Sequence, residues 1–271
     1  MRIYVHSKGR AGLRKGTLEA LEPLKDMTTI VCPIDQFNSY QEAHPGFNFA
    51  PVPIHWNLPE VQQGIVEFAH KQTHKKIIMM DDDLRFAHRI AWDPIKLATQ
   101  DTNTLINMIS GLDRVLNNVA HATISPRQGN NRADHIISNV GSARSVLAFR
   151  TDILKKHNIR FDRVPSKSDY DATLQLLRLG YHNTILWNYT HDQTGGPTLP
   201  GGCTESRTAD VHQRASEALA ALHPGFIKVV VKEKAAWTNT GGKRHDVVVY
   251  WKKAYQSSTP QSVPPLIRSK L

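Results

Sequence analysis

The 271-residue sequence predicts an α/β fold, in which a mixed, mostly parallel sheet is flanked by helices. Two observations lead to this prediction. An amphipathic helical pattern over 58–69 is followed directly by the continuous apolar run 77–80, which is typical of a strand buried on both faces of a sheet. Helical and strand patterns then alternate as far as about residue 191, in the order expected of an α/β domain.

The first part of the chain predicts a strand, a polar loop, a helix and a second strand. Ile3–Val5 is the first strand, residues 6–12 are the loop, and a helix is expected over about 15–25. The apolar run 28–32 is the second strand. Residues 33–56 are rich in proline, aromatic and turn-forming residues, so we predict an irregular connection there with at most one short helix.

The helix over 58–69 has a clear start, because Asn57 is a good N-cap and Glu60 follows three residues later, as in a capping box. The remaining elements follow from the same periodicities. We predict helices over 105–119, 151–157, 171–179 and 209–222, and strands over 122–125, 146–150, 184–187, 227–231 and 247–251. The last two strands resemble a hairpin.

Length and composition fit a folded protein with one large domain. Hydrophobic residues make up 40% of the chain and charged residues 21%, which is far from a disordered composition. The two cysteines, Cys32 and Cys203, lie in unrelated contexts and give no disulfide framework or zinc motif. The sequence shows no secretory signal and no apolar run long enough to span a membrane, so we expect a cytoplasmic protein that binds no membrane.

The positive charge is concentrated in two segments. The chain has 34 Lys and Arg against 24 Asp and Glu, a formal charge of +10. Residues 123–167 contribute +6 and residues 228–253 contribute +5, which leaves −1 for the rest. Two basic segments in an otherwise balanced protein suggest a polyanionic partner such as nucleic acid, although solvated basic faces would give the same count.

An acidic triplet, Asp81, Asp82 and Asp83, directly follows the apolar strand. If the backbone stays extended, Asp81 and Asp83 point to one face and Asp82 to the other. Two like carboxylates at the carboxyl end of a strand repel each other unless a cation lies near them, and oxygen ligands select Mg²⁺ or Mn²⁺. We therefore predict a metal and phosphate site; the alternative is a solvated acidic turn.

The sequence resembles the nucleotide-sugar glycosyltransferases of the Rossmann-like GT-A fold over roughly residues 1–195. The resemblance rests on an N-terminal strand and basic loop, on the Asp-x-Asp motif after an apolar strand, and on an ordered series of acceptor-side segments. Those segments are Val146–Leu154, Ile159–Asp162, Ser168–Leu174, Leu179–Tyr181 and the strand that leads to His191.

The resemblance implies roles for particular residues on the donor side. Asp81 and Asp83 would hold the metal, and His191 would complete the metal site from the opposite wall. The nucleotide sugar, expected to be a UDP-sugar, would be bound by His6, Ser7, Lys8, Arg10, Asp81 and Asp82. A glycine- and proline-rich segment, 195–202, would act as a lid over the donor.

Asp169 would be the catalytic base, in the place of the acid of the family's xED motif. This sequence has Ser168 where the family prefers Glu, which leaves both the base and the stereochemistry open. Each of these residues could instead have a structural or solvent-exposed role without any part in catalysis. Asp169 or Ser168 suits a helix N-cap, His191 could be structural, and Lys8 and Arg10 could be solvated loop bases.

The predicted acceptor is a 5-hydroxymethylpyrimidine base in phage DNA, which would place the protein in the cytoplasm of an infected bacterial host. The chain resembles, by general pattern, phage glycosyltransferases encoded with Tet/JBP-type or hydroxymethylating enzymes. The residues expected to contact the acceptor are Arg127, Arg132, Arg144, Lys167, Lys243 and Arg244. The alternatives are a transferase that builds a polysaccharide or glycolipid, a non-catalytic DNA-binding protein, and a metal nuclease.

The predicted organisation is one GT-A domain over 1–225, with a donor half at about 1–100 and an acceptor half at about 101–225. A basic β-hairpin extension over 226–256 packs on the same domain, and a Ser- and Pro-rich tail over 257–271 is expected to be disordered. The protein would be a monomer or a homodimer.

Overall fold

The computed structural model describes residues 1–13, 16–90, 93–127, 135–193, 199–203, 208–233, 244–264 and 266. The strands are β1 Arg2–His6, β2 Thr28–Pro33, β3 Asn48–Val52, β4 Lys76–Asp81, β5 Leu84–Ile90, β6 Asp93–Thr99, β7 His121–Pro126, β8 Ile137–Asn139, β9 Val146–Arg150, β10 Asn183–Gln193, β11 Ile227–Lys232 and β12 Arg244–Val249. The helices are α1 Thr17–Ala20, α2 Phe37–Ala43, α3 Leu58–Lys71, α4 Thr102–Val115, α5 Thr151–Lys156, α6 Ser168–Arg178, α7 Ala209–Leu222 and α8 Trp251–Gln256, with 3₁₀ helices η1 Glu22–Met27 and η2 Ile34–Gln36.

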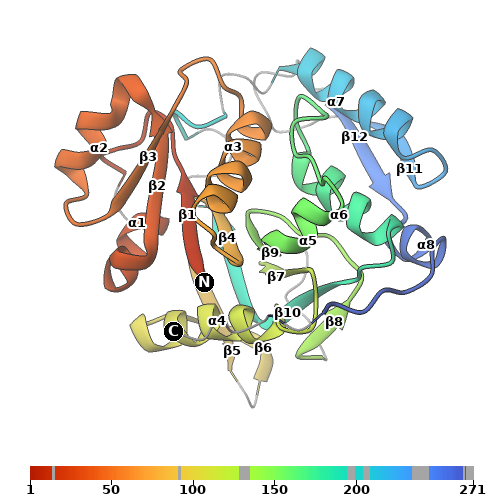
Figure 1. Ribbon diagram of the computed structural model, residues 1–271, viewed down its shortest axis with the longest axis horizontal. Helices are drawn as coiled ribbons and strands as arrows, with labels where there is room; N and C mark the ends of the chain where they lie inside the picture. The colour runs from red at the N-terminus through yellow and green to blue at the C-terminus, as the bar shows by residue number, and fades with distance from the viewer. Residues whose placement is uncertain are drawn as a thin grey trace.

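The predicted fold class is confirmed. Ten strands form one mixed sheet in the order β3-β2-β1-β4-β9-β7-β10-β5-β6, with β8 paired to β10 (Figure 1). The strands β3, β2, β1 and β4 are parallel, β9 runs against them, and β7 and β10 return to the first direction. β11 and β12 form a separate antiparallel pair, as the hairpin prediction requires, although β12 begins at Arg244 rather than at 247.

Helices cover both faces of the sheet and produce a three-layer arrangement. Side chains of α1, α2 and α4 pack in one core with alternate residues of the central strands, and those of α3, α5 and α6 pack in a second core on the other face. β4 contributes to both, since Ile78 and Met80 lie in the first core while Ile77 and Met79 lie in the second. The apolar run is therefore buried on both faces, as predicted.

A third, smaller core joins the C-terminal part of the chain to the sheet domain. We call α7, β11, β12 and α8 together the C-terminal unit. Leu174 and Leu177 of α6 pack there against Leu219 of α7 and Ala254 of α8. In Figure 1 this unit lies beside α6, on the side opposite the N-terminal strands.

Three local predictions were wrong. Residues 48–52, expected to be irregular, form the edge strand β3, where Pro51 is tolerated because an edge residue need not donate a ladder hydrogen bond. The helix expected over 15–25 is short, since α1 ends at Ala20 and the chain continues as the 3₁₀ helix η1, which contains Pro23. The helix expected over 105–119 starts earlier, at Thr102, and ends at Val115.

The expected disorder of the tail is also wrong for residues 257–264. The backbone N–H of Gln261 donates to the carbonyl of Gly180 at 2.9 Å, and Val263 packs against the second core. The fully buried Arg150 donates to the carbonyl of Pro264 at 3.0 Å. A buried guanidinium needs acceptors, and the tail supplies one of them.

Within the described residues, no helix is both long enough and apolar enough to cross a bilayer.

Candidate functional site

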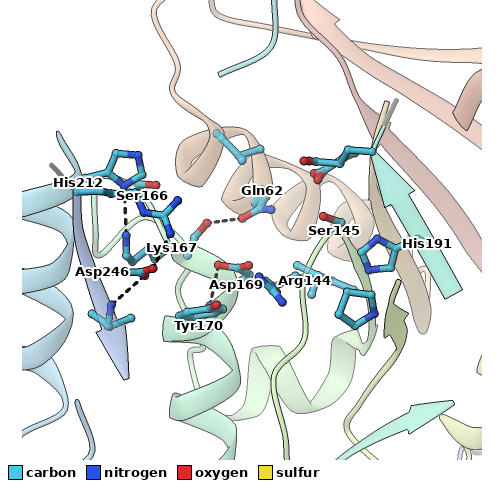
Figure 2. A pocket seen from close by; sticks show the side chains of 18 of the residues that line it. Gln62, Arg144, Ser145, Ser166, Lys167, Asp169, Tyr170, His191, His212 and Asp246 are labelled. Carbon is cyan, nitrogen blue, oxygen red and sulfur yellow. Dashed lines mark hydrogen bonds and ion pairs between the residues drawn. The ribbon is translucent and has the colours of Figure 1, made fainter. Parts of the chain in front are cut away.

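Two cavities meet at the carboxyl end of β4. The first, here the N-terminal pocket, has a volume of about 270 Å³ and lies among the loop after β1, the acidic triplet and residues 52–61. The second, the central pocket, has a volume of about 520 Å³ and lies among α3, the start of α6, the end of β10 and the C-terminal unit (Figure 2). Leu58, Asp81 and Gln193 line both cavities, so Asp81 stands at their junction.

The register of the sheet brings His6 beside Asp81. β1 and β4 are parallel, and His6 is the strand partner of Asp81. Nε2 of His6 lies 2.8 Å from Oδ1 of Asp81. Burial alone would raise the pKa of Asp81, but the hydrogen bond and charge of His6 hold it below its usual value. The Asp81 carboxylate is therefore ionised at neutral pH.

The other two acids of the triplet do not follow the extended alternation that the sequence predicted. β4 ends at Asp81 and the chain turns, so Asp82 and Asp83 both reach Arg10. Nη1 of Arg10 donates to Oδ1 of Asp82 at 2.7 Å and to Oδ2 of Asp83 at 3.1 Å. Ser7 also donates to Asp82. The expected pairing of Asp81 with Asp83 on one face is thus replaced by Asp82 with Asp83 around a guanidinium.

The pKa of Asp83 is raised although Arg10 lies beside it. Burial and the charges of Asp81 and Asp82 raise the pKa of Asp83 to about 6, although Arg10 works in the opposite direction. Its Oδ1 is buried and has no hydrogen-bond partner among the described residues. A buried carboxylate oxygen without a donor is suited to a cation, or to a donor carried by a ligand.

His191, near the end of β10, faces the central pocket from the side opposite α6 (Figure 2). Burial lowers the pKa of His191 to about 4, so the ring is neutral at pH 7. Its Nε2 is buried without a hydrogen-bond partner in the described structure, and its hydrogen bond to the backbone of Arg144 therefore uses Nδ1. An imidazole that binds a metal is commonly held in this way, with one nitrogen on a carbonyl and the other open.

The predicted metal ligands fit a cation only in part. Asp81 and His191 lie close enough for each to shift the pKa of the other, and both are in the protonation state that a metal requires. Within the described part of the chain, however, no three His, Cys, Asp or Glu side chains come together as a metal cage. This arrangement fits an ion held by few protein ligands together with the phosphates of a substrate, which is usual for Mg²⁺. An imidazole ligand favours Mn²⁺ over Mg²⁺.

Asp169 lies in the first turn of α6 and lines the central pocket, close to Arg144 (Figure 2). Burial raises the pKa of Asp169 to about 6, while the backbone N–H of Tyr170 and the charge of Arg144 lower it. A carboxylate with this pKa is a suitable proton acceptor near neutral pH. The N-cap of α6 is Lys167 in the left-handed conformation, so neither Asp169 nor Ser168 is the cap.

Ser168, which stands where the resemblance would place Glu, makes a different contact. Its hydroxyl donates to Oε1 of Gln62 on α3 at 2.7 Å, and both side chains are buried. This hydrogen bond ties the start of α6 to α3 at the wall of the central pocket. It fixes the backbone that carries Asp169.

The structure places only some of the predicted acceptor residues at the central pocket. Arg144, Lys167 and Arg244 line the central pocket. Arg127 is not among its lining residues and lies 4.0 Å from Asp192. Arg132 and Lys243 fall outside the described residues, as do residues 195–198 of the expected lid.

On the donor side, the structure brings together the residues that the sequence analysis named. His6, Ser7, Lys8 and Arg10 all line the N-terminal pocket, together with the three acids of the triplet. Gly202, at the end of the expected lid, lines the same cavity.

Sequence reasoning missed several residues of the central pocket, which come from segments far apart in the chain. They are Gln62, Ser145, Tyr170, His212, Lys232 and Asp246. The net charge of +5 over residues 228–253 was the one signal in the sequence that pointed to Lys232. Nothing in the sequence indicated Gln62 or His212.

The model of the TET-associated glycosyltransferase family matches residues 1–195 of this chain. The chain belongs to this family. It is therefore a glycosyltransferase of the nucleotide-diphospho-sugar type, as the sequence predicted, and it uses a nucleotide-sugar donor.

No curated protein matches the chain. Among solved structures, it is similar to a mannose-1-phosphate geranyltransferase of Thermus thermophilus, with 10% identity, 70% of this chain and 75% of that chain covered, and a TM-score of 0.47. It is also similar to a protein of Desulfovibrio desulfuricans assigned as a nucleotide-diphospho-sugar transferase, with 11% identity, coverages of 82% and 99%, and a TM-score of 0.41. These low values say nothing about the activity of this chain.

Proposed function

We propose that this glycosyltransferase is metal-dependent and moves a sugar from a UDP-sugar to a 5-hydroxymethylpyrimidine base in DNA, in the cytoplasm of a phage-infected bacterium. In this proposal the N-terminal pocket binds the nucleotide and the central pocket binds the acceptor. The observation that carries it is the position of Asp81 and Asp169. Asp81 stands where the two cavities meet, and Asp169, with its raised pKa, lies in the cavity left for the acceptor.

The donor side supports a nucleotide-sugar diphosphate. Lys8, His6 and Trp56 line the N-terminal pocket, where Lys8 offers a positive charge and Trp56 an aromatic face. Arg10 offsets one of the two negative charges of Asp82 and Asp83 and so reduces the repulsion that a diphosphate would meet there. Asp81 and His191 would hold Mn²⁺ or Mg²⁺ together with the phosphates of the donor, whereas Asp83 is paired with Arg10. The ion would supply charge stabilisation for the leaving diphosphate.

The proposed reaction is a displacement at the anomeric carbon. Asp169 accepts the proton of the acceptor hydroxyl, whose oxygen forms the new bond to that carbon. The bond between the anomeric carbon and the diphosphate oxygen breaks, and UDP leaves with the electron pair. Arg144, beside Asp169, favours the ionised carboxylate that the step requires. A single displacement of this kind inverts the anomeric configuration.

The DNA acceptor is supported by the charge of the chain and by where it lies. The formal charge is +10, and Arg144, Lys167, Lys232 and Arg244 line the cavity assigned to the acceptor. Basic groups around a deep cavity suit a base that leaves the duplex stack while the backbone stays outside. A neutral saccharide could accept hydrogen bonds from these groups but would gain no charge attraction.

The test is incubation of the protein with Mn²⁺, a panel of UDP-sugars and hydroxymethylated DNA, followed by mass analysis of the nucleosides. We expect one modified nucleoside to gain the mass of a sugar, and we expect Asp169→Asn to lower the rate ~10²–10⁴-fold. Unmodified DNA is the control. Glycosylation of a saccharide without any gain on DNA would contradict the acceptor assignment.

A second measurement isolates the donor site. We expect UDP with Mn²⁺ to raise the melting temperature of the protein, because a ligand that binds only the folded state stabilises it. Asp81→Asn should remove most of this shift while Asp210→Asn, an exposed change on α7, should keep it. An unchanged shift in Asp81→Asn would contradict the proposed role of Asp81.

A further inference from the structure

The C-terminal unit lies outside residues 1–195, yet it forms one wall of the central pocket. His212 of α7, Lys232 of β11, and Arg244 and Asp246 of β12 all line this cavity. They share it with Asp169 at the start of α6. Part of the acceptor site is therefore built by a segment beyond the region that the family model matches.

This wall is held firmly against the sheet domain. Besides the small apolar core between α6, α7 and α8, a buried hydrogen bond joins the two parts, since Nε2 of His223 lies 2.7 Å from Oδ1 of Asp171. Arg178 of α6 adds a hydrogen bond to the carbonyl of Leu222 at 2.9 Å. The C-terminal unit is thus fixed against α6 by packing.

Two cations share one carboxylate in this wall, and a third lies in the same cavity. Nζ of Lys232 and Nη2 of Arg244 each lie 2.8 Å from the same oxygen, Oδ2 of Asp246. Nζ of Lys167 lies 3.4 Å from Nδ1 of His212. Burial would raise the pKa of Asp246, but its hydrogen bonds and the two cations lower it to about 2, so it stays ionised. The three cations and this carboxylate sum to +2.

These four groups, of which Lys232 is exposed, attract an anion that enters beside them. Burial lowers the pKa of Lys167, and a neighbouring anion would oppose this shift by stabilising the charged form. An anion bound here would lie in the same cavity as Asp169. A phosphate of a polynucleotide is an anion that accompanies every base, and contacts to it position a protein on the strand.

We infer that Lys167, Lys232 and Arg244 form a binding subsite for a backbone phosphate of the DNA acceptor, which the C-terminal unit adds to the family domain. The inference rests on the proposed function and names how that acceptor is held. Asp246 holds Lys232 and Arg244 in place between β11 and β12. The bound phosphate positions the hydroxymethylated base so that its hydroxyl lies near Asp169.

The test compares Lys232→Gln and Arg244→Gln with Lys228→Gln. Lys228 lies on the same strand as Lys232 but does not line the cavity, and it is exposed. The affinity for a hydroxymethylated oligonucleotide is measured as a function of salt concentration. Each pocket variant should flatten the slope of log K against log[salt] by about 0.7–0.9 and weaken binding several-fold at about 0.15 M salt. Lys228→Gln should keep the slope of the unaltered protein.

Equal slopes for Lys232→Gln, Arg244→Gln and Lys228→Gln would overturn the inference. Lys232 is an exposed side chain, so its substitution should not unfold the protein, and melting temperatures check this. A titration with the hydroxymethylated nucleoside 5′-monophosphate separates the two sources of phosphate. If Lys232→Gln and Arg244→Gln lose affinity for the monophosphate but not for the oligonucleotide, the assignment to the DNA backbone is overturned.

Sugar transfer by the unaltered protein, measured in parallel, separates the inference from the proposed function. Transfer to DNA with no variant effect on the salt slope would leave the function standing and reject the subsite. Flattened slopes without transfer of any sugar would support the subsite and reject the function. An absence of DNA binding by the unaltered protein would reject both.

Discussion

The pKa values of three aspartates around the two pockets are shifted in opposite directions although their side chains are identical. The partner His6 lowers the pKa of Asp81, whereas burial raises the pKa values of Asp83 and Asp169 to about 6. The environment of each residue therefore decides its chemistry. Asp81 stays an anion suited to a cation, and Asp169 becomes a base that can take a proton and release it near neutral pH.

The pKa of Asp169 predicts the acid limb of the activity profile. Only the ionised carboxylate accepts a proton, so kcat/KM for sugar transfer should fall as the pH drops through about 6. Asp83 has a similar pKa, so the affinity for UDP is measured over the same range as a control. A rate that stays constant between about pH 7 and pH 5 would contradict the assignment of Asp169 as the base.

The same pKa shift affects stability with a definite sign. The folded state holds a proton on Asp169 up to about pH 6, whereas the unfolded chain releases it near 3.8, so this group destabilises the fold as the pH rises between these values. We expect Asp169→Asn to raise the free energy of unfolding at about pH 7, with the gain disappearing below about pH 4. Urea denaturation at the two pH values measures it, and a destabilised variant at neutral pH would contradict the expectation.

At the scale of elements, a short glycine-rich segment holds the loop of the N-terminal pocket. Arg10 donates to the carbonyls of Leu199, Pro200 and Gly201, and the N–H of Gly202 donates to the carbonyl of Lys8 at 2.7 Å. Gly201 has a φ of +80°, and a Cβ there would lie 2.8 Å from the carbonyl oxygen of Lys8. Glycine is required at this position both for its backbone conformation and for the close approach.

Gly201→Ala should therefore loosen this segment from the loop that carries Lys8 and Arg10. We expect the affinity for UDP to fall ~5–30-fold, because a side chain in this region strains the backbone by about 1–2 kcal/mol. Calorimetric titration with UDP and Mn²⁺ measures the affinity. Gly12→Ala is the matched control, since a Cβ there would meet nothing within 4 Å. Equal affinities for the two variants would contradict the expectation.

At the scale of the whole molecule, the buried hydrogen bond between Asp171 and His223 joins the sheet domain to the C-terminal unit. Asp171 is fully buried and also accepts two hydrogen bonds from Arg163, at 2.9 and 3.0 Å. Removal of Asp171 would leave the buried His223 and the partly exposed Arg163 without this acceptor. This wall of the central pocket thus depends on a network whose residues, Asp171 and His223, do not line the cavity.

Asp171→Asn should lower the free energy of unfolding by about 3–5 kcal/mol. Asp210→Asn is the matched control, because Asp210 pairs with Arg214 on the exposed face of α7 and should cost about 0.5 kcal/mol or less. Denaturant unfolding measures both changes. A change of similar size in the two variants would show that the buried network does not hold the unit.

The sequence by itself determined the α/β fold class, the family, and the order of most elements. These follow from periodicity and from local motifs, such as the capping box of Asn57 and Glu60, whose two hydrogen bonds the structure contains. It also identified Asp81 by its place after the apolar strand, and the resemblance to the glycosyltransferase family pointed to Asp169 and His191.

The tertiary structure alone decided how those residues are grouped. The turn after Asp81 directs Asp82 and Asp83 to Arg10, and the folding of the chain brings Gln62, His212, Lys232 and Asp246 to one cavity. Periodicity reports which face of its own element a side chain occupies, and it carries no information about which distant element lies opposite. Contacts between segments far apart in the chain are set by packing of the three cores, which only the folded chain specifies.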